Sequence, residues 1–181
     1  SDFPQTIIHS ASSSAFRIVY AGDIYVGSEP QWEQLAAMLE KNTAKKGTEL
    51  RVDLYTSAHV PAAIRALTCV RVHAAVGSEI FSIMQQADAL LIVLPENKKD
   101  ERTTKFFEYL PLRKPLLVVA PEGEITEYVA THKLGVHSSQ SEEQLGALLS
   151  GQFRATTFNA HFDVSSHTAL QRANEIMKLL A

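Results

Sequence analysis

The sequence predicts an α/β protein: a single domain with a Rossmann-like, doubly wound parallel sheet flanked by helices. Short apolar or β-branched runs alternate with segments of helical spacing, a pattern typical of parallel sheets covered on both sides. The run 89–94 is apolar at every position, as a strand buried on both faces requires. Right-handed crossovers leave few topologies for such a chain, and the doubly wound sheet is the leading one.

The individual elements follow from this alternation. Strands are predicted at 16–21, 50–55, 69–73, 89–94, 115–120 and 134–136, the last as a short edge strand. Helices are predicted at 30–41, 60–67, 78–86, 103–110, 124–131, 141–149 and 165–180. Pro30 suits a first helical turn, because its missing N–H would be unpaired there anyway. Ser141 followed by Gln144 has the spacing of a capping box.

Length and composition bound the classes of protein to consider. The chain has 181 residues, 45% of them hydrophobic, which fits one globular domain. A net charge of -3 without a basic block excludes a nucleic-acid-binding or anionic-membrane-binding footprint. A single cysteine, Cys69, excludes a disulfide framework and favours a cytoplasmic protein. Neither a membrane-spanning run nor a signal peptide is expected.

The first fifteen residues differ from the rest. They contain Ser10, Ser12, Ser13 and Ser14 and show no clear hydrophobic period. We interpret 1–15 as a linker or strap and 16–181 as the domain. A chain that begins with a linker indicates a piece of something longer.

A ligand site is expected after the first and fourth strands, because open α/β sheets bind ligands where the strand order reverses. Gly22 and Asp23 directly follow the first strand, and glycine allows close backbone approach to a ligand. The alternative is a plain turn that ends the strand. The segment has neither the G-x-G-x-x-G fingerprint of dinucleotide-binding folds nor a P-loop, so those two classes are not predicted.

The segment after the fourth strand is long, polar and enters a helix near Thr103. A helix start offers unpaired N–H groups to a pyrophosphate, and Thr104 and Lys105 add a hydroxyl and a positive charge. Glu108 lies one turn further on the same face, where a carboxylate could accept hydrogen bonds from ribose hydroxyls. The alternative is a surface Lys105–Glu108 pair that stabilises the helix by about 0.3–0.5 kcal/mol.

The stretch 103–117 resembles the donor-domain signature of two-lobed GT-B glycosyltransferases, of the retaining group 1 type. In that signature a Lys-x-x-Glu-Tyr helix is followed by a basic residue, a proline and an apolar strand. Other landmarks come in the same order: a strand ending in Gly22, an Ala87–Asp88 pair before an apolar strand, and Gly123 before a helix. The resemblance covers roughly 17–149.

The resemblance implies roles for particular residues. Glu108 would bind the ribose hydroxyls, while Thr103, Thr104 and Lys105 would meet the phosphates. Asp100 would contact the donor sugar, in a place where the family has a glutamate. The base would lie between the exits of the third and fourth strands, which are His73, Ala74, Ala75, Leu94 and Pro95. Many family members have an Arg and a Lys after the first strand; this chain has Asp23 there, and Lys98, Lys99, Arg102 and Lys105 are the cations that would compensate.

The function implied by the resemblance is transfer of a sugar from a nucleoside-diphosphate sugar to a glycan, lipid or small-molecule acceptor, as in polysaccharide biosynthesis. The acceptor-binding N-terminal lobe is missing, so this piece alone is expected to be inactive. Any peripheral membrane association would come through that lobe. No cofactor or metal is expected, since the fold type relies on the helix end and cations, and the seven histidines form no H-x-x-x-H set.

Two alternatives remain open at this point. A sugar-nucleotide epimerase would reuse much the same donor site on the same fold. A non-enzymatic α/β regulatory module would instead place an acidic metal cluster, including Asp53 and Asp88, at the edge of the sheet.

Overall fold

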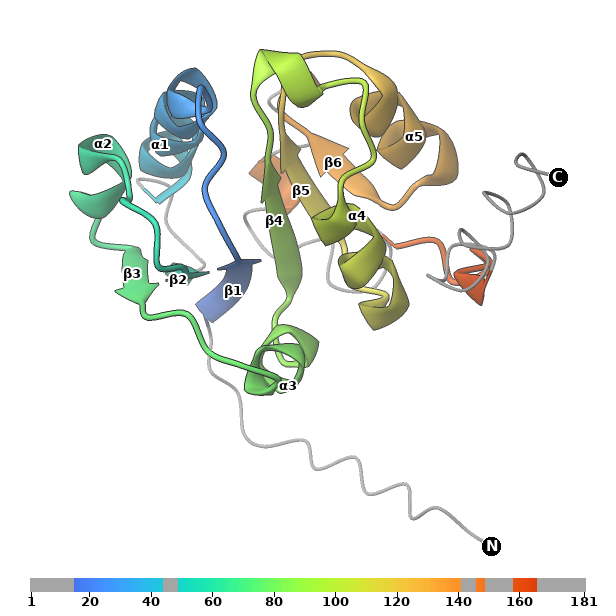
Figure 1. The fold of residues 1–181 in the computed structure, drawn as a ribbon, viewed down its shortest axis with the longest axis horizontal. Coiled ribbons are helices and arrows are strands. Elements are labelled where there is room, and N and C mark those ends of the chain that lie inside the picture. The colour runs from blue at the N-terminus through green and yellow to red at the C-terminus, as the bar shows by residue number, and fades with distance from the viewer. Residues whose placement is uncertain (1–14, 44–48, 141–145, 149–157, 166–181) are drawn as a thin grey trace, which may run out of the picture.

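The computed structural model describes residues 15–43, 49–140, 146–148 and 158–165, and these form a six-stranded parallel sheet between two layers of helices (Figure 1). The strand order is β3-β2-β1-β4-β5-β6, with every neighbouring pair parallel. The chain therefore moves outward from β1 to β3, crosses back to β4 and continues outward to β6. This confirms the doubly wound sheet, with its reversal between β1 and β4.

The strands lie close to their predicted positions. They are β1 (Ala15–Ala21), β2 (Glu49–Tyr55), β3 (Val70–His73), β4 (Ala89–Val93), β5 (Leu116–Val119) and β6 (Gly135–His137). β1 includes Ala15, the last residue of the expected strap. β6 lies at one edge of the sheet, as the sequence predicts.

The helices are α1 (Glu29–Thr43), α2 (Ala62–Arg65), α3 (Glu79–Gln85), α4 (Thr104–Tyr109) and α5 (Glu124–His132). Two 3-10 turns, η1 (Glu96–Lys98) and η2 (Leu110–Leu112), flank α4. α2 is shorter than the predicted helix 60–67, because Pro61 lies before its first residue and has an extended backbone. Of the predicted helix 141–149, residues 146–148 are helical; its cap at Ser141 and Gln144 lies outside the described residues, as does 166–180 of the last predicted helix.

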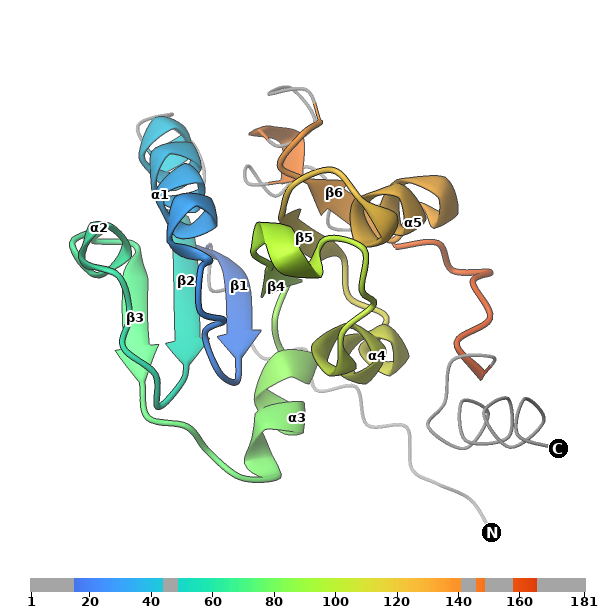
Figure 2. The same ribbon diagram turned by 45° about the horizontal axis from the view of Figure 1, so that its top comes forward.

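The two faces of the sheet have separate cores. Trp32, Leu35 and Leu39 of α1 pack with Ile64 of α2 on one face, against the even-numbered residues of β1 and β2. Met84 of α3, Phe106 of α4 and Val129 of α5 pack on the other face, mainly against β4 and β5. Figures 1 and 2 show α1 and α2 on one side of the sheet and α3, α4 and α5 on the other. Residues at the β1–β4 boundary are thus held from both sides.

The second face is unevenly covered. α3 lies beneath β1 and β4, and no described helix lies beneath β2 and β3 (Figure 1). The residues of β2 and β3 that point to this side are charged or aromatic and include Arg51, Asp53, Tyr55, Arg71 and His73. The prediction of a parallel sheet flanked by helices is confirmed, and among the described residues this second layer of helices covers β4 and β5 and leaves the outer part of the β3 side open.

Candidate functional site

The candidate site lies where β1 and β4 end side by side. Gly22 is the first residue after β1, with φ +100°, a backbone conformation that favours glycine. Its N–H donates to the carbonyl of Tyr55, at a distance of 2.9 Å, which holds the turn against the end of β2. A Cβ at Gly22 would lie 3.6 Å from Cε of Lys105. The turn after β1 and the helix after β4 are therefore in contact, as parallel neighbouring strands require.

Lys105 is buried beneath this turn. Its side chain runs from α4 so that Nζ donates to the carbonyl of Asp23 at 3.3 Å and lies 3.6 Å from the ring centroid of Tyr20. The residue is 7% exposed, and burial lowers its pKa to about 7, while the charges of Asp23 and Glu108 act in the opposite direction. The alternative of a surface Lys105–Glu108 ion pair is wrong, because the ammonium group turns inward to the β1 turn.

Tyr109 attaches α4 to the same turn, a role that the sequence analysis did not assign. Its hydroxyl accepts a hydrogen bond from the N–H of Ala21 at 3.0 Å and donates to the carbonyl of Ala21 at 3.3 Å. Burial raises the pKa of Tyr109, so the phenol stays protonated and able to donate. The tyrosine of the Lys-x-x-Glu-Tyr pattern was the available signal, since a buried tyrosine hydroxyl needs a partner.

Glu108 is exposed and faces a cavity of about 170 Å³ at the carboxyl edge of the sheet. Gly22 and Tyr55 form one wall of this cavity, and Ala75 and Val76, after β3, form another. Ile80, Phe81 and Met84 of α3 complete the lining, and Phe81 is 48% exposed. The carboxylate, the glycine turn and an apolar wall thus meet in one place. We name this the Glu108 cavity.

The predicted base-binding residues are only partly gathered there. Ala75 lines the cavity, whereas His73 turns toward Asp53, with 2.8 Å between Nε2 and Oδ1. His73 also stacks on Tyr55, with ring centroids 4.5 Å apart, so it packs against a residue that lines the cavity without lining the cavity itself. Ala74 is exposed outside the lining. Leu94 is buried in the core, and Cβ of Pro95 lies 3.9 Å from the place a Cβ would occupy on Gly27.

Three of the four cations expected to bind phosphate have acidic partners. Lys98 pairs with Glu101 at 2.9 Å, Lys99 pairs with Glu96, and Arg102 pairs with Glu124 at 2.7 Å. The two lysine pairs are three residues apart, a spacing that was readable in the sequence. Within the part of the chain that the structure describes, Lys105 is the one of the four without a carboxylate in ion-pair contact.

Thr103, Thr104 and Asp100 have different surroundings. Thr103 is 8% exposed, and its buried Oγ1 has no hydrogen-bond partner among the described residues, although Thr103 lies directly before α4. Thr104 is exposed. Asp100 lies against the start of α5: a Cβ at Gly123 would be 2.9 Å from its Oδ1 and 2.6 Å from the carbonyl oxygen of Lys99. Asp100 is not among the residues that line the Glu108 cavity.

A buried charge cluster supports the wall behind Tyr55. Asp53 is fully buried and binds Arg17 at 2.6 Å, Arg51 at 3.0 Å and His73 at 2.8 Å. Burial acts to raise the pKa of Asp53, but the hydrogen bonds from these three partners outweigh it and hold the pKa below its usual value. The carboxylate is therefore charged at neutral pH and orients the imidazole that stacks on Tyr55.

The described residues lack two features. They contain no group of three His, Cys, Asp or Glu side chains that could hold a metal ion. None of their helices combines the length and the apolar character that crossing a bilayer demands.

Known proteins resemble the chain in structure and not in sequence. No family model matches it, and no curated protein matches it in sequence. The glycotransferase of kitacinnamycin superimposes with a TM-score of 0.52 at 13% identity, over 99% of this chain and 46% of that one. The UDP-GlcNAc 2-epimerase of Methanocaldococcus jannaschii superimposes with a TM-score of 0.52 at 9% identity, over 93% of this chain and 47% of that one.

A third structure, HepE of Anabaena in complex with UDP and glucose, gives a TM-score of 0.50 at 12% identity, over 91% of this chain and 49% of that one. The chain spans about half the length of each of these three solved proteins. Identities this low show the fold alone. The chain accordingly has the fold of the C-terminal domain of GT-B glycosyltransferases, which UDP-GlcNAc 2-epimerases share.

Proposed function

We propose that this chain is the donor-binding half of a glycosyltransferase and holds a nucleoside-diphosphate sugar at the Glu108 cavity. One observation carries the proposal: Glu108 and Gly22 face the same cavity at the point where the strand order reverses. Ligands of open α/β sheets bind at that point. We place the domain in the cytoplasm and in polysaccharide synthesis; the single half-buried Cys69 fits a reducing compartment.

Each part of the donor has a matching group. The exposed Glu108 carboxylate accepts hydrogen bonds from ribose hydroxyls, and Ala75, Val76 and Phe81 offer an apolar surface to the base. Lys105 lies directly beneath the Gly22 turn, where a diphosphate would approach the backbone. The ammonium donates to the carbonyl of Asp23 and faces the Tyr20 ring, so a phosphate at the Gly22 turn would have to draw its remaining N–H donors outward.

The chemistry follows from these positions. Glycosyl transfer breaks the bond between the anomeric carbon and the diphosphate, and negative charge grows on the departing oxygen. A buried cation held in place before the reaction stabilises that charge more than a solvated one does. A diphosphate also favours the protonated form of Lys105, so binding draws a proton onto a group whose pKa is about 7 in the free protein.

Calorimetric titration of the chain with UDP, GDP and ADP tests the proposal. We expect one of the three to bind, and Glu108→Ala to weaken that binding by about 1–3 kcal/mol, the usual loss for a hydrogen bond to a charged group. Glu127→Ala, which removes an exposed carboxylate on α5, is the matched control and should leave affinity unchanged. Absence of heat with all three nucleotides, or equal effects of the two variants, would contradict the proposal.

A sugar-nucleotide epimerase is the second candidate, favoured by the superposition on the M. jannaschii enzyme. An epimerase inverts a sugar carbon without an acceptor, whereas a transferase releases free nucleoside diphosphate only when an acceptor is present. Incubating the full-length protein with UDP-GlcNAc alone and following the sugar protons by NMR separates the two. Appearance of the carbon-2 epimer would replace the transferase proposal.

The regulatory-module alternative loses its main support. That reading requires Asp53 and Asp88 to gather at the carboxyl edge of the sheet. Asp53 is instead neutralised by two arginines, and Asp88 accepts a hydrogen bond from the N–H of Arg17 at 2.8 Å, near the opposite edge.

A further inference from the structure

The cation of the proposed donor site does not lie in the cavity itself. Gly22 and Glu108 are among the residues that line the Glu108 cavity, and Lys105 is not. Its Nζ lies close to the turn that forms the wall, 3.7 Å from the place a Cβ would occupy on Gly22. Lys105 is 7% exposed, so its ammonium group is next to the cavity and covered. A diphosphate in the cavity can form an ion pair with Lys105 only after the wall or the side chain moves.

The segment that covers Lys105 is short and has a glycine at each end. It runs from Gly22, with φ +100°, to Gly27, with φ +82°, and we name residues 22–27 the cap loop. None of its residues is fully buried, and Val26 is 91% exposed. Short loops with little buried surface open at low cost, and small residues at their ends absorb the backbone rotation. The cap loop therefore has the features of a segment that moves as a unit.

The contacts that hold Lys105 under the cap loop are few. The carbonyl of Asp23 accepts a hydrogen bond from Nζ at 3.3 Å and another from the hydroxyl of Tyr20 at 2.6 Å. The Tyr20 ring centroid lies 3.6 Å from Nζ. Burial lowers the pKa of Lys105, so one carbonyl and one ring face do not fully replace the water that the ammonium group has lost. A phosphate oxygen would be a stronger partner than either, because it carries a full charge.

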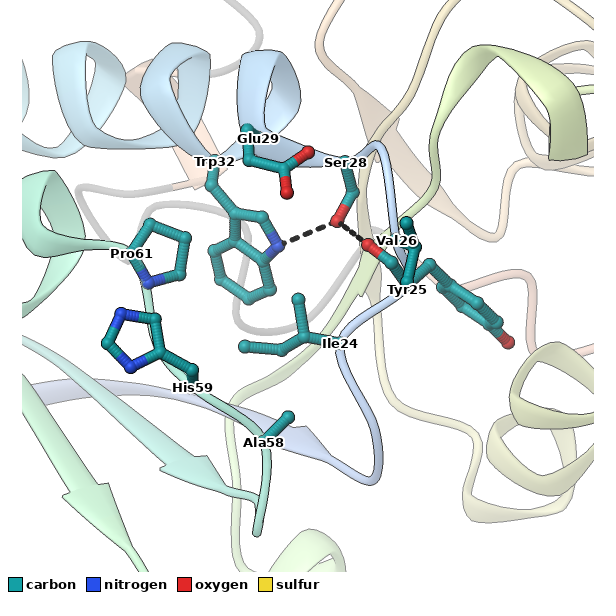
Figure 3. Close-up of a pocket in the computed structure, with 9 residues that line it drawn as sticks. All are labelled: Ile24, Tyr25, Val26, Ser28, Glu29, Trp32, Ala58, His59 and Pro61. Atoms are coloured by element: carbon teal, nitrogen blue, oxygen red, sulfur yellow. Dashed lines mark hydrogen bonds between the residues drawn. The ribbon is translucent and has the colours of Figure 1, made fainter.

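Tyr25 attaches the cap loop to η1 and to α4. Its ring centroid lies 5.6 Å from Nζ of Lys98 and 5.6 Å from Nζ of Lys105. An aromatic face attracts a cation at such distances, and more strongly where water is excluded. In Figure 3 the Tyr25 side chain extends away from Trp32. The ring therefore contributes to holding the cap loop over Lys105.

The backbone of Tyr25 connects the cap loop to the core on the other face of the sheet. Its carbonyl accepts a hydrogen bond from the hydroxyl of Ser28, and Oγ of Ser28 accepts one from the indole N–H of Trp32 at 3.1 Å (Figure 3). On this side the cap loop forms one wall of a cavity of about 430 Å³, and Ala58 and Pro61 form the opposite wall (Figure 3). Trp32 does not line the Glu108 cavity, so a change at its indole reports on the loop and not on a ligand.

We propose that the cap loop holds Lys105 out of the Glu108 cavity in the free protein and releases it to the diphosphate of a bound nucleotide, with Tyr25 as the residue that positions the loop. The identity of the ligand rests on the proposed function. Because the diphosphate binds the released form of Lys105 better, nucleotide binding and release favour each other. The apparent affinity is reduced by the fraction of molecules in which Lys105 is held back. Loosening the cap loop therefore tightens nucleotide binding.

Calorimetry of Tyr25 variants tests the release, with whichever of UDP, GDP and ADP binds the parent most tightly. Tyr25→Leu removes the aromatic face and should raise the affinity about threefold, in keeping with a partly exposed cation–π contact. Tyr25→Phe keeps the face and should restore the affinity of the parent. Val26→Ala, at an exposed position of the same loop, is the matched control. In a Lys105→Met background Tyr25→Leu should have no effect, because no ammonium group is left to release.

Two outcomes of this cycle would overturn the proposal. Weaker binding of Tyr25→Leu would show that the ring contacts the nucleotide. An equal rise in affinity with and without Lys105 would show that the loop acts on the ligand by another route.

A second measurement needs no nucleotide. The ε-methylene protons of Lys105 are adjacent to the Tyr20 ring, whose ring current shields protons above its face. With carbon-13-labelled lysine, one ε-methylene signal should lie upfield of the others in the parent and be absent from Lys105→Met. Tyr25→Leu should move this signal toward the other lysines, whereas Val26→Ala should not. Absence of an upfield signal in the parent, or equal positions in parent and Tyr25→Leu, would overturn the proposal.

The same signals keep the cap loop apart from the proposed function. Saturating nucleotide should move the Lys105 signal to the position of exposed lysines and shift the single resonance of 5-fluorotryptophan at Trp32, the only tryptophan of the chain. If a nucleotide binds and neither signal moves, the donor site stands and the release is overturned. If none of the three nucleotides binds, the donor site is contradicted, and the Lys105 signal of parent and Tyr25→Leu still decides whether the loop holds the lysine.

Discussion

The two halves of the sheet are built differently, although both arise from short apolar runs. Every residue of β4 and β5 is buried, whereas no residue of β3 is. In β2 the residues on one face are apolar and those on the other are Arg51, Asp53 and Tyr55. Helices α3, α4 and α5 cover the β4 side of that second face, and no described helix covers β2 and β3 there.

The two halves therefore have different roles: one is rigidly packed, and the other carries charged groups. The β4–β5 half holds α4 firmly and so fixes Lys105, Glu108 and Tyr109 against the β1 turn. The β2–β3 half contributes loops and a charge cluster, with His73 supporting Tyr55 at the cavity wall. We expect the first half to be sensitive to volume and the second to be sensitive to charge and pH.

The largest effect is expected from a volume change in the β4 half. Leu91 is fully buried, so Leu91→Ala should lower the free energy of unfolding by about 2–5 kcal/mol, through lost transfer energy and a cavity. Val72 of β3 is 44% exposed, and Val72→Ala should cost less than about 1 kcal/mol. Urea denaturation of both variants checks the contrast. Similar costs would show that the two halves are equally packed.

The next effect concerns charge in the β2 half. Asp53→Asn removes the carboxylate that Arg17, Arg51 and His73 share, and should cost about 1–3 kcal/mol at pH 7. Because the pKa of Asp53 is held below its usual value of about 3.9, its contribution is full above that value and is lost as pH falls below it. The variant should therefore lose less stability than the parent on acidification. Parallel stability–pH curves in denaturant titrations would contradict this.

Lys105 lies on α4 beside the turn after β1, where the two halves meet, and Lys105→Met should raise the free energy of unfolding. Folding lowers the Lys105 pKa from 10.5 to about 7, so its cost is absent above about pH 10.5 and complete below about pH 7. Methionine removes that cost, and at pH 6 we expect a gain on the order of 1–3 kcal/mol, offset by the lost hydrogen bond to Asp23.

The same variant should bind nucleoside diphosphates more weakly, measured by calorimetry beside the melting curves. More stability with less binding is the signature of a residue retained for function. Lys133→Met, at an exposed position after α5, controls for loss of a charge. A Lys105→Met variant that is less stable at pH 6 would show that the buried lysine is structural.

The smallest effect is expected at the end of α5, on the β5 side. Lys133 has φ 55°, a left-handed conformation that glycine adopts at less cost. Lys133→Gly should raise the free energy of unfolding by less than about 1 kcal/mol, and with it the melting temperature slightly. Thermal unfolding followed by circular dichroism is sensitive enough. A clear loss of stability would indicate that the lysine side chain contributes contacts of its own.

Much of the fold was predictable, because hydrophobic periodicity is a local property. The run at β4 is apolar at every position, and right-handed crossovers leave few topologies for six strands, among which the doubly wound sheet is the leading one. The uneven cover of the second face was less obvious. Its signal was the alternation Arg51, Asp53, Tyr55 within β2, which a strand buried on both faces does not show.

The candidate site was predictable in position and only partly in detail. The switch point and the face of α4 place Glu108 and Gly22 together. The burial of Lys105 depends on how the β1–α1 loop folds over it, which no local pattern encodes. The cavity lined by Ile24, Ala58 and Pro61 has no sequence signal either, because its walls come from two loops and a helix that meet only in the folded protein. The site roles themselves stay predictions until the titrations above are done.

Gly123 has no Cβ, and the loop before α4 packs closely against it. Its backbone is extended, so any residue could adopt its conformation, yet a side chain there would collide with the carbonyl of Lys99. The loop 95–102 packs against Gly123 through Lys99 and Asp100, and it contacts Gly27 through Pro95. Adding one carbon at 123 would push this loop away from the start of α5 and shift α4, which follows the loop directly and carries Glu108. Altered ligand preference could therefore arise from a position that no ligand contacts.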